Sequence, residues 1–161
     1  MTTAALIVAA GRGIRAGAGQ AKQWRTLKGQ RVIDWTLCAF ERSMVDLIVL
    51  VLPPDDEAIW RSFSATSGLT LVAGGSDRAE SVLNGLKALQ KHDVTKVLIH
   101  DAARPFFTHR LIDRCLQALE HHDAVLPALP TTDTLKEVDG VLVSKTLDRS
   151  HIVAAQTPQC F

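Results

Sequence analysis

Short runs of apolar residues alternate along this chain with longer segments in which apolar residues recur every three or four positions. The short runs consist of Leu, Ile, Val and Ala with little polar alternation, which is typical of strands covered on both faces. We therefore expect buried strands at 4–9, 47–52, 69–72, 97–100 and 124–128.

The longer segments between these runs predict amphipathic helices. Their apolar residues fall on one helical face at 32–40, 58–63, 79–89 and 111–119. The third helix also has a start signal, because Asp77 is followed three residues later by Glu80. Strands and helices alternating at this spacing predict βαβ units and a mainly parallel sheet with helices on both sides. The predicted fold class is α/β, a Rossmann-like three-layer sandwich.

The pattern changes in the last part of the chain. Asp139-Gly140 lies between two strand-like segments, 134–138 and 141–146, which predicts a β-hairpin with a type I′ turn. A hairpin this late in a parallel α/β chain leaves the sheet as an arm, a lid or a dimer contact. We expect a projecting β-hairpin arm at about 133–149.

Composition and charge exclude several kinds of protein. The 161 residues, 47% of them apolar, predict one domain over 1–161. With 18 Lys and Arg against 17 Asp and Glu, the net charge of +1 indicates neither a nucleic-acid nor a membrane partner. No apolar run reaches membrane-spanning length. Cys38, Cys115 and Cys160 lie far apart and form no disulfide framework or CxxC metal motif, which favours a cytoplasmic protein.

The loop after the first apolar run carries the strongest functional signal. Its glycines, among them Gly11 and Gly13, let the backbone approach a ligand and point N–H groups at an anion. Arg15 and Lys22 place positive charge where phosphates would lie. These features favour a polyphosphate clamp over a plain glycine-rich surface loop.

Two other phosphate-binding motifs fit this loop less well. Gly11-x-Gly13-x-x-Ala16 satisfies the dinucleotide fingerprint, but the glycines that follow make a poor helix, which that fingerprint requires. The Walker motif needs Gly-Lys-Ser/Thr, which the loop lacks. An NAD-dependent oxidoreductase is therefore only a weak alternative.

Polar residues also follow the third and fourth apolar runs. Because ligands bind at the carboxyl ends of strands in open α/β sheets, Gly74-Gly75 and Asp101 would share an edge with the glycine loop. Asp101 is a candidate Mg²⁺ ligand with Arg104 ordering the site, or else it caps the next turn and Arg104 forms a plain ion pair. Ser81 either contacts a base or ribose or caps its own turn. No Ser/His/Asp or Cys/His set has supporting context, so nucleophilic catalysis is not expected.

Six segments in the same order resemble one enzyme family over nearly the whole chain. They are Ala9-Ala10-Gly11-x-Gly13-x-Arg15 with Lys22-Gln23, Gly74-Gly75-x-x-Arg78-x-x-Ser81-Val82, His100-Asp101-Ala102-Ala103-Arg104-Pro105, Asp133-Thr134-Leu135-Lys136, Thr146-x-Asp148-Arg149 and Gln156-Thr157-Pro158-Gln159. Together they resemble the 2-C-methyl-D-erythritol 4-phosphate cytidylyltransferases, CTP-using enzymes of the non-mevalonate isoprenoid pathway. The first segment is shared by many sugar-nucleotide transferases, whereas the second, third and last are far more specific.

The resemblance implies a reaction and a set of site residues. CMP would pass from CTP to 2-C-methyl-D-erythritol 4-phosphate with release of pyrophosphate, and Mg²⁺ would be the cofactor. The enzyme would be a homodimer, in which the arm of one subunit brings Arg149 to the site of the other. The resemblance assigns catalytic roles to Arg15, Lys22 and Arg149. It assigns substrate contacts to Ala10, Gly11, Gly13, Gly75, Ser81, Ala102, Arg104, Thr134 and Thr157, of which Thr134 and Thr157, with Arg149, would receive the methylerythritol phosphate. Asp101 would bind Mg²⁺ or the ribose end of the site.

The chain departs from the family pattern in two places. Ala21 stands where the family has Pro before the loop lysine. The family also continues beyond the Thr-Pro-Gln segment, in some bacteria into a fused cyclodiphosphate synthase, so we expect a C-terminally truncated form or the front of such a fusion. The alternatives left open are a non-catalytic nucleotide-binding module and a related nucleotidyltransferase with another base or acceptor.

Overall fold

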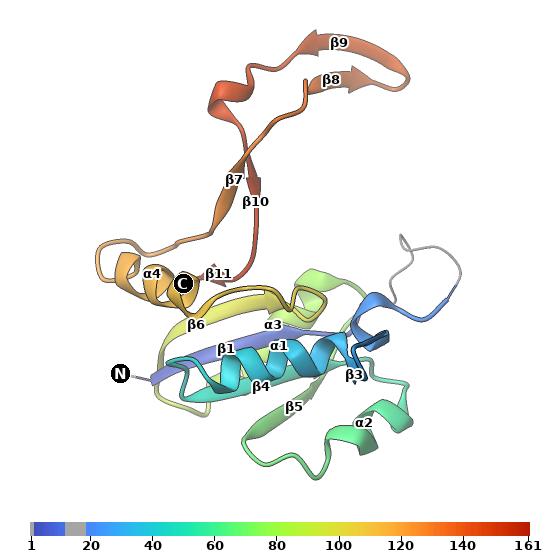
Figure 1. Ribbon diagram of the computed structural model, residues 1–161, viewed down its shortest axis with the longest axis vertical. Coiled ribbons are helices and arrows are strands. Elements are labelled where there is room, and N and C mark those ends of the chain that lie inside the picture. Colours follow the sequence, from blue (N-terminus) through green and yellow to red (C-terminus); the bar gives the residue numbers. More distant parts are fainter. Residues whose placement is uncertain (1, 12–18) are drawn as a thin grey trace.

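A five-stranded sheet forms the centre of the computed structural model, which describes residues 2–11 and 19–161. Its strand order is β11-β6-β1-β4-β5; the last four are parallel, and β11 is antiparallel to β6 (Figure 1). The bounds are β1 Thr2–Val8, β4 Leu47–Leu52, β5 Leu69–Ala73, β6 Val94–Asp101 and β11 Gln159–Cys160. The mainly parallel sheet and four of its predicted strands are thus confirmed.

The fifth predicted strand, at 124–128, is wrong. Only Val125 of this segment touches the sheet, through an isolated bridge to Cys160, and Ala128 already begins a strand that leaves it. The place beside β6 is taken by β11, a two-residue strand whose surrounding sequence shows no apolar run.

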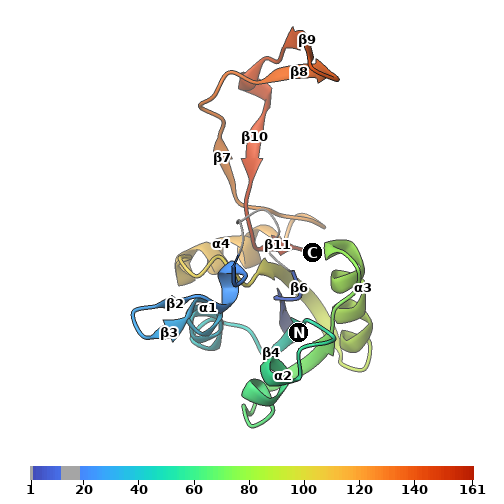
Figure 2. The same cartoon turned by 90° about the vertical axis from the view of Figure 1, so that its right-hand side faces the viewer.

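Helices cover the two faces of the sheet, as the predicted three-layer sandwich requires (Figure 2). They are α1 Val32–Glu41, α2 Glu57–Phe63 and α4 His109–Ala118 on one face and α3 Arg78–Leu89 on the other. In β1, Ala5 and Ile7 pack into the cluster with the first three helices, and the intervening Leu6 packs toward α3. A Cβ on Gly85 of α3 would lie 2.6 Å from Leu6 Cδ1, so the glycine lets this helix approach the sheet closely.

The predicted start of α3 is confirmed only in part. Asp77 accepts a hydrogen bond from the backbone N–H of Glu80 at 2.8 Å, as an N-cap should. Glu80 does not complete a capping box, because its carboxylate accepts from Ser76 instead of the Asp77 backbone.

Between β1 and α1 the chain forms three short elements. They are the 3-10 helix η2 Lys22–Trp24 and the two-stranded hairpin of β2 Thr26–Leu27 and β3 Gln30–Arg31. Trp24 is buried against the core that α1 and α2 share. This packing fixes the point at which the chain returns from the glycine loop.

The predicted arm is present and longer than expected. Antiparallel β7 Ala128–Pro130 and β10 Val153–Ala155 form its stem, and β8 Lys136–Asp139 and β9 Leu142–Thr146 form its tip (Figure 1). The predicted type I′ turn is wrong, because Asp139 pairs with Leu142 and the two turn residues are Gly140 and Val141. Gly140 has φ +58°, but Val141 is not among the positive-φ residues of the described chain, and type I′ needs both.

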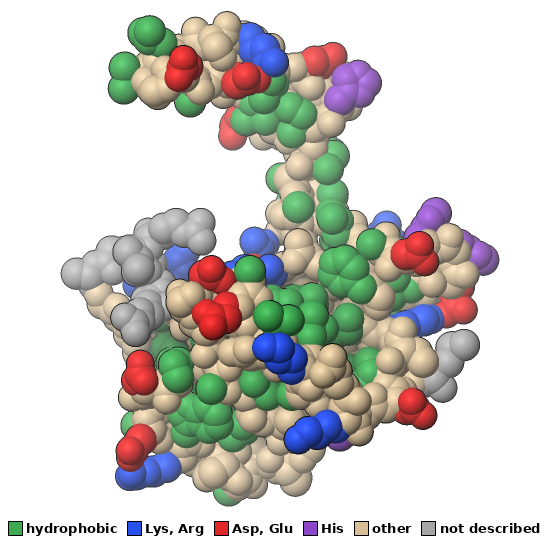
Figure 3. All heavy atoms as spheres, turned by 180° about the vertical axis from the view of Figure 1, so that it is seen from behind, with side chains coloured by type: hydrophobic (Ala, Val, Ile, Leu, Met, Phe, Trp, Pro, Cys, Tyr) green, Lys and Arg blue, Asp and Glu red, His purple; other side chains and the backbone are tan. Residues whose placement is uncertain are grey.

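Two further features concern the surface of the arm and the lengths of the helices. Figure 3 shows hydrophobic side chains on both the stem and the tip of the arm. Val141 at the tip is 97% exposed and Leu142 is 73% exposed. Within the described ranges, no helix is long and apolar enough to cross a membrane.

Candidate active site

Three loops meet where the parallel strands end. Backbone hydrogen bonds extend the sheet into each of them, from Ala9 N to Val51 O, from Gly74 N to Leu52 O and from Ala102 N to Val8 O. A Cβ on Gly74 would lie 2.3 Å from the Cβ of Ala10, so the first and third loops are in direct contact. The predicted convergence on one sheet edge is therefore confirmed.

The first loop is held by a side chain from the far end of the glycine-rich segment. Gln23 is 6% exposed, and its Nε2 donates to Ala9 O at 2.9 Å and to Gly11 O at 2.7 Å. Lys22 is the residue directly before it. Gly13 and Arg15 lie outside the described residues, so their predicted contacts with CTP stay predictions.

The loop of residues 74–77 is fixed by two side chains of α3. Ser81 is 2% exposed; its Oγ donates to Asp77 O at 2.7 Å and accepts from Gly75 N at 3.0 Å. The Glu80 carboxylate accepts from Ser76 N at 2.7 Å and from Ser76 Oγ at 2.8 Å, and these hydrogen bonds lower the pKa of Glu80. The side chains of Glu80 and Ser81, both in α3, thus hold the 74–77 loop in place through hydrogen bonds.

Ser81 keeps one acceptor position after these two contacts, because a hydroxyl has one hydrogen and two lone pairs. Gly75 lies close to the Glu80 side chain, since a Cβ at Gly75 would lie 2.3 Å from Glu80 Cγ. The predicted contacts of Gly75 and Ser81 with cytosine and ribose stay predictions, now on a loop that is held in place before any ligand arrives.

Asp101 sits between two arginines at the end of β6. Its Oδ1 accepts from Arg78 Nε and its Oδ2 from Arg104 Nε, each at 3.1 Å. Arg78 also donates to Gln159 Oε1 at 3.1 Å, and Arg104 donates to Gln156 Oε1. This network joins α3, β6 and the segment by which the chain returns from the arm.

A protein-held metal ion does not fit this arrangement. Both oxygens of Asp101 already accept hydrogen bonds from cationic groups. Across residues 2–11 and 19–161, no three His, Cys, Asp or Glu side chains come together as a metal-binding group. Asp101 as a Mg²⁺ ligand stays a prediction, in which phosphate oxygens of a bound nucleotide would supply the other ligands.

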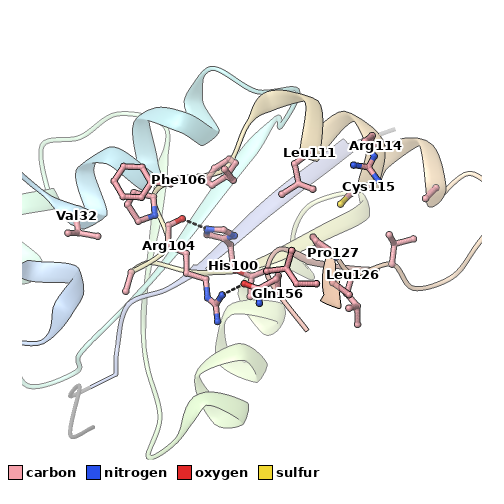
Figure 4. A pocket seen from close by; sticks show the side chains of 18 of the residues that line it. Val32, His100, Arg104, Phe106, Leu111, Arg114, Cys115, Leu126, Pro127 and Gln156 are labelled. Carbon is pink, nitrogen blue, oxygen red and sulfur yellow. Dashed lines mark hydrogen bonds between the residues drawn. The ribbon is translucent and has the colours of Figure 1, made fainter. Parts of the chain in front are cut away.

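A cavity of about 1180 Å³ opens beside the network, between the loop after β6, α4 and the stem of the arm. Lys22, Arg104 and Thr157 line it, together with apolar side chains. Figure 4 shows Arg104 with two of these apolar residues, Phe106 and Leu111. The predicted residues Lys22, Arg104 and Thr157 thus share one hollow, and it is rich in positive charge.

Two buried polar atoms at this cavity lack a hydrogen-bond partner among the described residues, Thr157 Oγ1 and His100 Nδ1. Buried polar atoms are nearly always paired, and Thr157 lines the same cavity as Lys22 and Arg104, so its hydroxyl is a candidate contact for a ligand. Ala102, at the end of β6, is buried, and its carbonyl accepts from Thr36 Oγ1 of α1 at 2.9 Å.

His100 is a packed core residue of β6. It is 1% exposed, and its ring makes edge contacts with Phe40 and Phe107. Nε2 lies 3.0 Å from the carbonyl oxygen of Arg104, which can only accept, so neutral His100 carries its proton on Nε2 (Figure 4). Burial lowers the pKa of His100 to about 4.

Thr134 and Arg149 are not brought to this edge within the chain. Both lie in the arm, which projects away from the layered body (Figure 1). Arg149, in the 3-10 helix η3 Arg149–His151, donates to Thr132 O. Their predicted contacts with the acceptor, made from the arm of a second subunit, stay predictions.

The sequence assigned no site role to Gln23 or Arg78, and it gave Glu80 a role only at the start of α3. Gln23 and Arg78 stand inside the quoted motifs, next to or near residues that were assigned. Their position in those motifs could have indicated a role at the site. Their contacts could not be predicted, because they join residues that lie 12 to 81 positions apart in the chain.

Comparison with known proteins agrees with the fold and the motif order. The family model for 2-C-methyl-D-erythritol 4-phosphate cytidylyltransferase (IspD) matches residues 3–161. A "Bifunctional enzyme IspD/IspF" of Ruegeria pomeroyi is 53% identical over the whole chain, and the chain covers 42% of that protein. A "2-C-methyl-D-erythritol 4-phosphate cytidylyltransferase" of Cereibacter sphaeroides is 46% identical, also over the whole chain, which covers 73% of it.

Solved structures show the same relationship. The 4-diphosphocytidyl-2C-methyl-D-erythritol synthase of Anaerococcus prevotii superposes with a TM-score of 0.82 at 33% identity, over 99% of this chain and 69% of that one. The bifunctional IspDF of Campylobacter jejuni superposes with a TM-score of 0.80 at 26% identity, over 99% of this chain and 40% of that one. The chain spans less than half the length of the bifunctional relatives. By sequence, motif order and fold, it belongs to the 2-C-methyl-D-erythritol 4-phosphate cytidylyltransferase family of nucleotidyltransferase enzymes.

Proposed function

We propose that this chain carries the cytidylyltransferase activity of its family, transferring CMP from CTP to 2-C-methyl-D-erythritol 4-phosphate with release of pyrophosphate. One observation carries the proposal beyond family membership: Lys22, Arg104 and Thr157 line one cavity beside the converging loops, and the buried Thr157 hydroxyl has no hydrogen-bond partner among the described residues. Two cations and a free hydroxyl suit a phosphate monoester, which is the chemical class of the acceptor.

CTP would lie over the ends of the strands. Ala10 and Gly11 would lie along its triphosphate with Gly13 and Arg15, and Gly75, Ser81 and Ala102 would contact cytosine and ribose. The free acceptor position of Ser81 suits the amino group of cytosine, which is a donor. Pinning of the 74–77 loop by Glu80 and Ser81 supports selective base recognition, since a fixed loop loses little conformational entropy when it binds.

The reaction would be an in-line attack of an acceptor phosphate oxygen on the α-phosphorus of CTP. The new P–O bond forms as the bond to pyrophosphate breaks, and negative charge grows on the oxygens around phosphorus. Such chemistry needs positioning and charge neutralisation more than a strong base. Lys22 and Arg15 would neutralise this charge, while Arg104 and Thr157 would hold the acceptor phosphate.

The active form would be a homodimer built through the arm. Its tip exposes Val141, Leu142 and Val143, and such apolar surface favours association. The arm would carry Thr134 and Arg149 of one subunit to the acceptor site of the other. Its place would be the bacterial cytoplasm, and Mg²⁺ would enter with the nucleotide phosphates, neutralising their charge.

Pyrophosphate release tests the proposal. The full-length protein is incubated with CTP, ATP, GTP or UTP, with and without Mg²⁺ and the acceptor. Turnover that needs both CTP and the acceptor supports the proposal. Preference for another nucleotide or acceptor would favour a related nucleotidyltransferase, and tight CTP binding without turnover would favour a non-catalytic binding module.

A further inference from the structure

Gln23 has no role in the proposed reaction so far, although its side chain holds the first loop. Its carboxamide is buried behind the first loop, and both hydrogens of Nε2 are donated, one to Ala9 O at 2.9 Å and one to Gly11 O at 2.7 Å. A single side chain therefore holds two carbonyl groups on either side of Ala10. It reaches them from η2, across a chain separation of 12 to 14 residues.

Both ends of this contact are anchored. Ala9 is tied to the sheet, since its N–H donates to Val51 O at 2.8 Å. On the other side, Trp24 is buried in the core, and its N–H donates to Ala21 O at 3.0 Å. Gln23 thus joins a strand end to the short helix that presents Lys22.

The direction of the two carbonyl groups matters for an anion. A carbonyl oxygen carries partial negative charge, so two of them facing a triphosphate would repel it. Because the carbonyls of Ala9 and Gly11 accept hydrogen bonds from the Gln23 amide, their oxygens face that side chain.

We propose that Gln23 is a positioning residue of the nucleotide site. It sets the distance between Lys22 and the Ala10–Gly11 backbone, and it keeps two carbonyl oxygens away from the bound phosphates. The inference rests on the proposed cytidylyltransferase function. Gln23 itself touches no substrate and acts through Lys22 and the loop.

Replacement of Gln23 by methionine tests this role in the full-length enzyme, because Q23M keeps the length of the side chain and removes both donors. A displacement of a catalytic group by about 1 Å can cost on the order of 100-fold in rate. We expect kcat with CTP to fall by at least about tenfold in Q23M, with a smaller change in KM, at a temperature well below its melting transition. Gln90, an exposed residue at the far end of α3, provides the matched control Q90M.

A second variant separates positioning from plain destabilisation. In Q23E a protonated carboxyl can donate one of the two lost hydrogen bonds, whereas the ionised form faces two carbonyl oxygens and is repelled. Burial and these carbonyls raise the pKa of such a carboxyl, so its neutral form is within reach of mildly acidic solution. The ratio of Q23E to Q23M activity should therefore rise as the pH falls from 8 to about 5.5. A residue that only filled space would give a ratio independent of pH.

The outcomes are distinguishable. Wild-type turnover with a tenfold lower kcat in Q23M and a pH-dependent Q23E ratio supports the inference. Wild-type turnover with normal kcat in folded Q23M, or with a flat ratio, overturns it while leaving the proposed function intact. If wild-type enzyme releases no pyrophosphate, the proposed function fails and the inference fails with it. Should Q23M not fold, as judged by circular dichroism, the Q23E pH profile against wild type decides alone.

Discussion

Gly74 and Ala10 are packed so closely that a Cβ on Gly74 would lie 2.3 Å from the Cβ of Ala10. No pair of real Cβ atoms stands at that distance, so Gly74→Ala must push the first and third loops apart. Overpacking of this kind costs about 1–3 kcal/mol of stability. Since both loops face the proposed nucleotide site, we also expect kcat/KM for CTP to fall by at least about tenfold, measured by pyrophosphate release.

Ala10→Gly provides the matched control, because it removes the Cβ atom that a Cβ at position 74 would contact. The double variant A10G/G74A moves the methyl group from one loop to the other. It should regain part of the lost stability and activity, although a Cβ at position 74 still meets Ser81 Oγ at 3.1 Å. Additive losses in the double variant would show that the two loops are not coupled through this contact.

Lys22→Ala should lower kcat by at least about tenfold, because it removes a charge that would stabilise the transition state. The fold should be unchanged, since Lys22 lines an open cavity and the adjacent Gln23 keeps its contacts. Steady-state kinetics and a thermal melt measure the two effects. Lys87→Ala, on the exposed side of α3, is the control; near-normal kcat in Lys22→Ala would contradict the role given to Lys22.

Asp101→Asn separates two roles for this carboxylate. In the structure it holds the guanidinium groups of Arg78 and Arg104, so the amide variant should loosen both and raise the KM for the acceptor. If Asp101 only holds these two arginines, the Mg²⁺ concentration that gives half-maximal rate stays near the wild-type value. A several-fold rise in that concentration would instead identify Asp101 as a metal ligand.

The sequence predicted the layered fold because its strands and helices have different periodicities. Ala5 and Ile7 face one helical layer and Leu6 faces the other, so β1 needs apolar residues at every position. The run at 124–128 has the same composition, yet only Val125 pairs with the sheet. Composition cannot tell a strand of the sheet from a segment that crosses to the stem of an arm.

The candidate site was predicted where a motif lies at a strand end. Gly75 and Asp101 are there because the carboxyl ends of parallel strands meet at one edge. The contacts that hold these loops were not predicted. One of these contacts joins Gln23 to Gly11, and another joins Arg78 to Gln159. The distance between the two segments in each contact depends on the register of the whole sheet. These contacts cannot be predicted from a single sequence, because the register of the sheet is not known from it.

Acidic solution should destabilise the protein through His100. Its folded pKa is about 4, lowered from 6.5 by burial, so the unfolded chain binds the proton more tightly. The stability that His100 contributes is fully present above pH 6.5 and is lost as the pH falls through 4, by about 3 kcal/mol. Urea unfolding at a series of pH values measures it. In His100→Phe, which keeps an aromatic ring and cannot titrate, the decline over this interval should be shallower.

A mixing experiment tests whether the arm of one subunit completes the site of another. Arg149→Ala removes the arm cation and Lys22→Ala removes the loop cation, so each variant alone should be nearly inactive. In an equal mixture that has exchanged subunits, half of the dimers are mixed, and one of the two sites in each holds both wild-type residues. Activity should then recover to about a quarter of the wild-type value. The double variant K22A/R149A mixed with wild type controls for exchange itself. No recovery in a mixture shown to contain mixed dimers would mean that Arg149 acts within its own subunit, whereas full activity of Arg149→Ala alone would mean that it has no role.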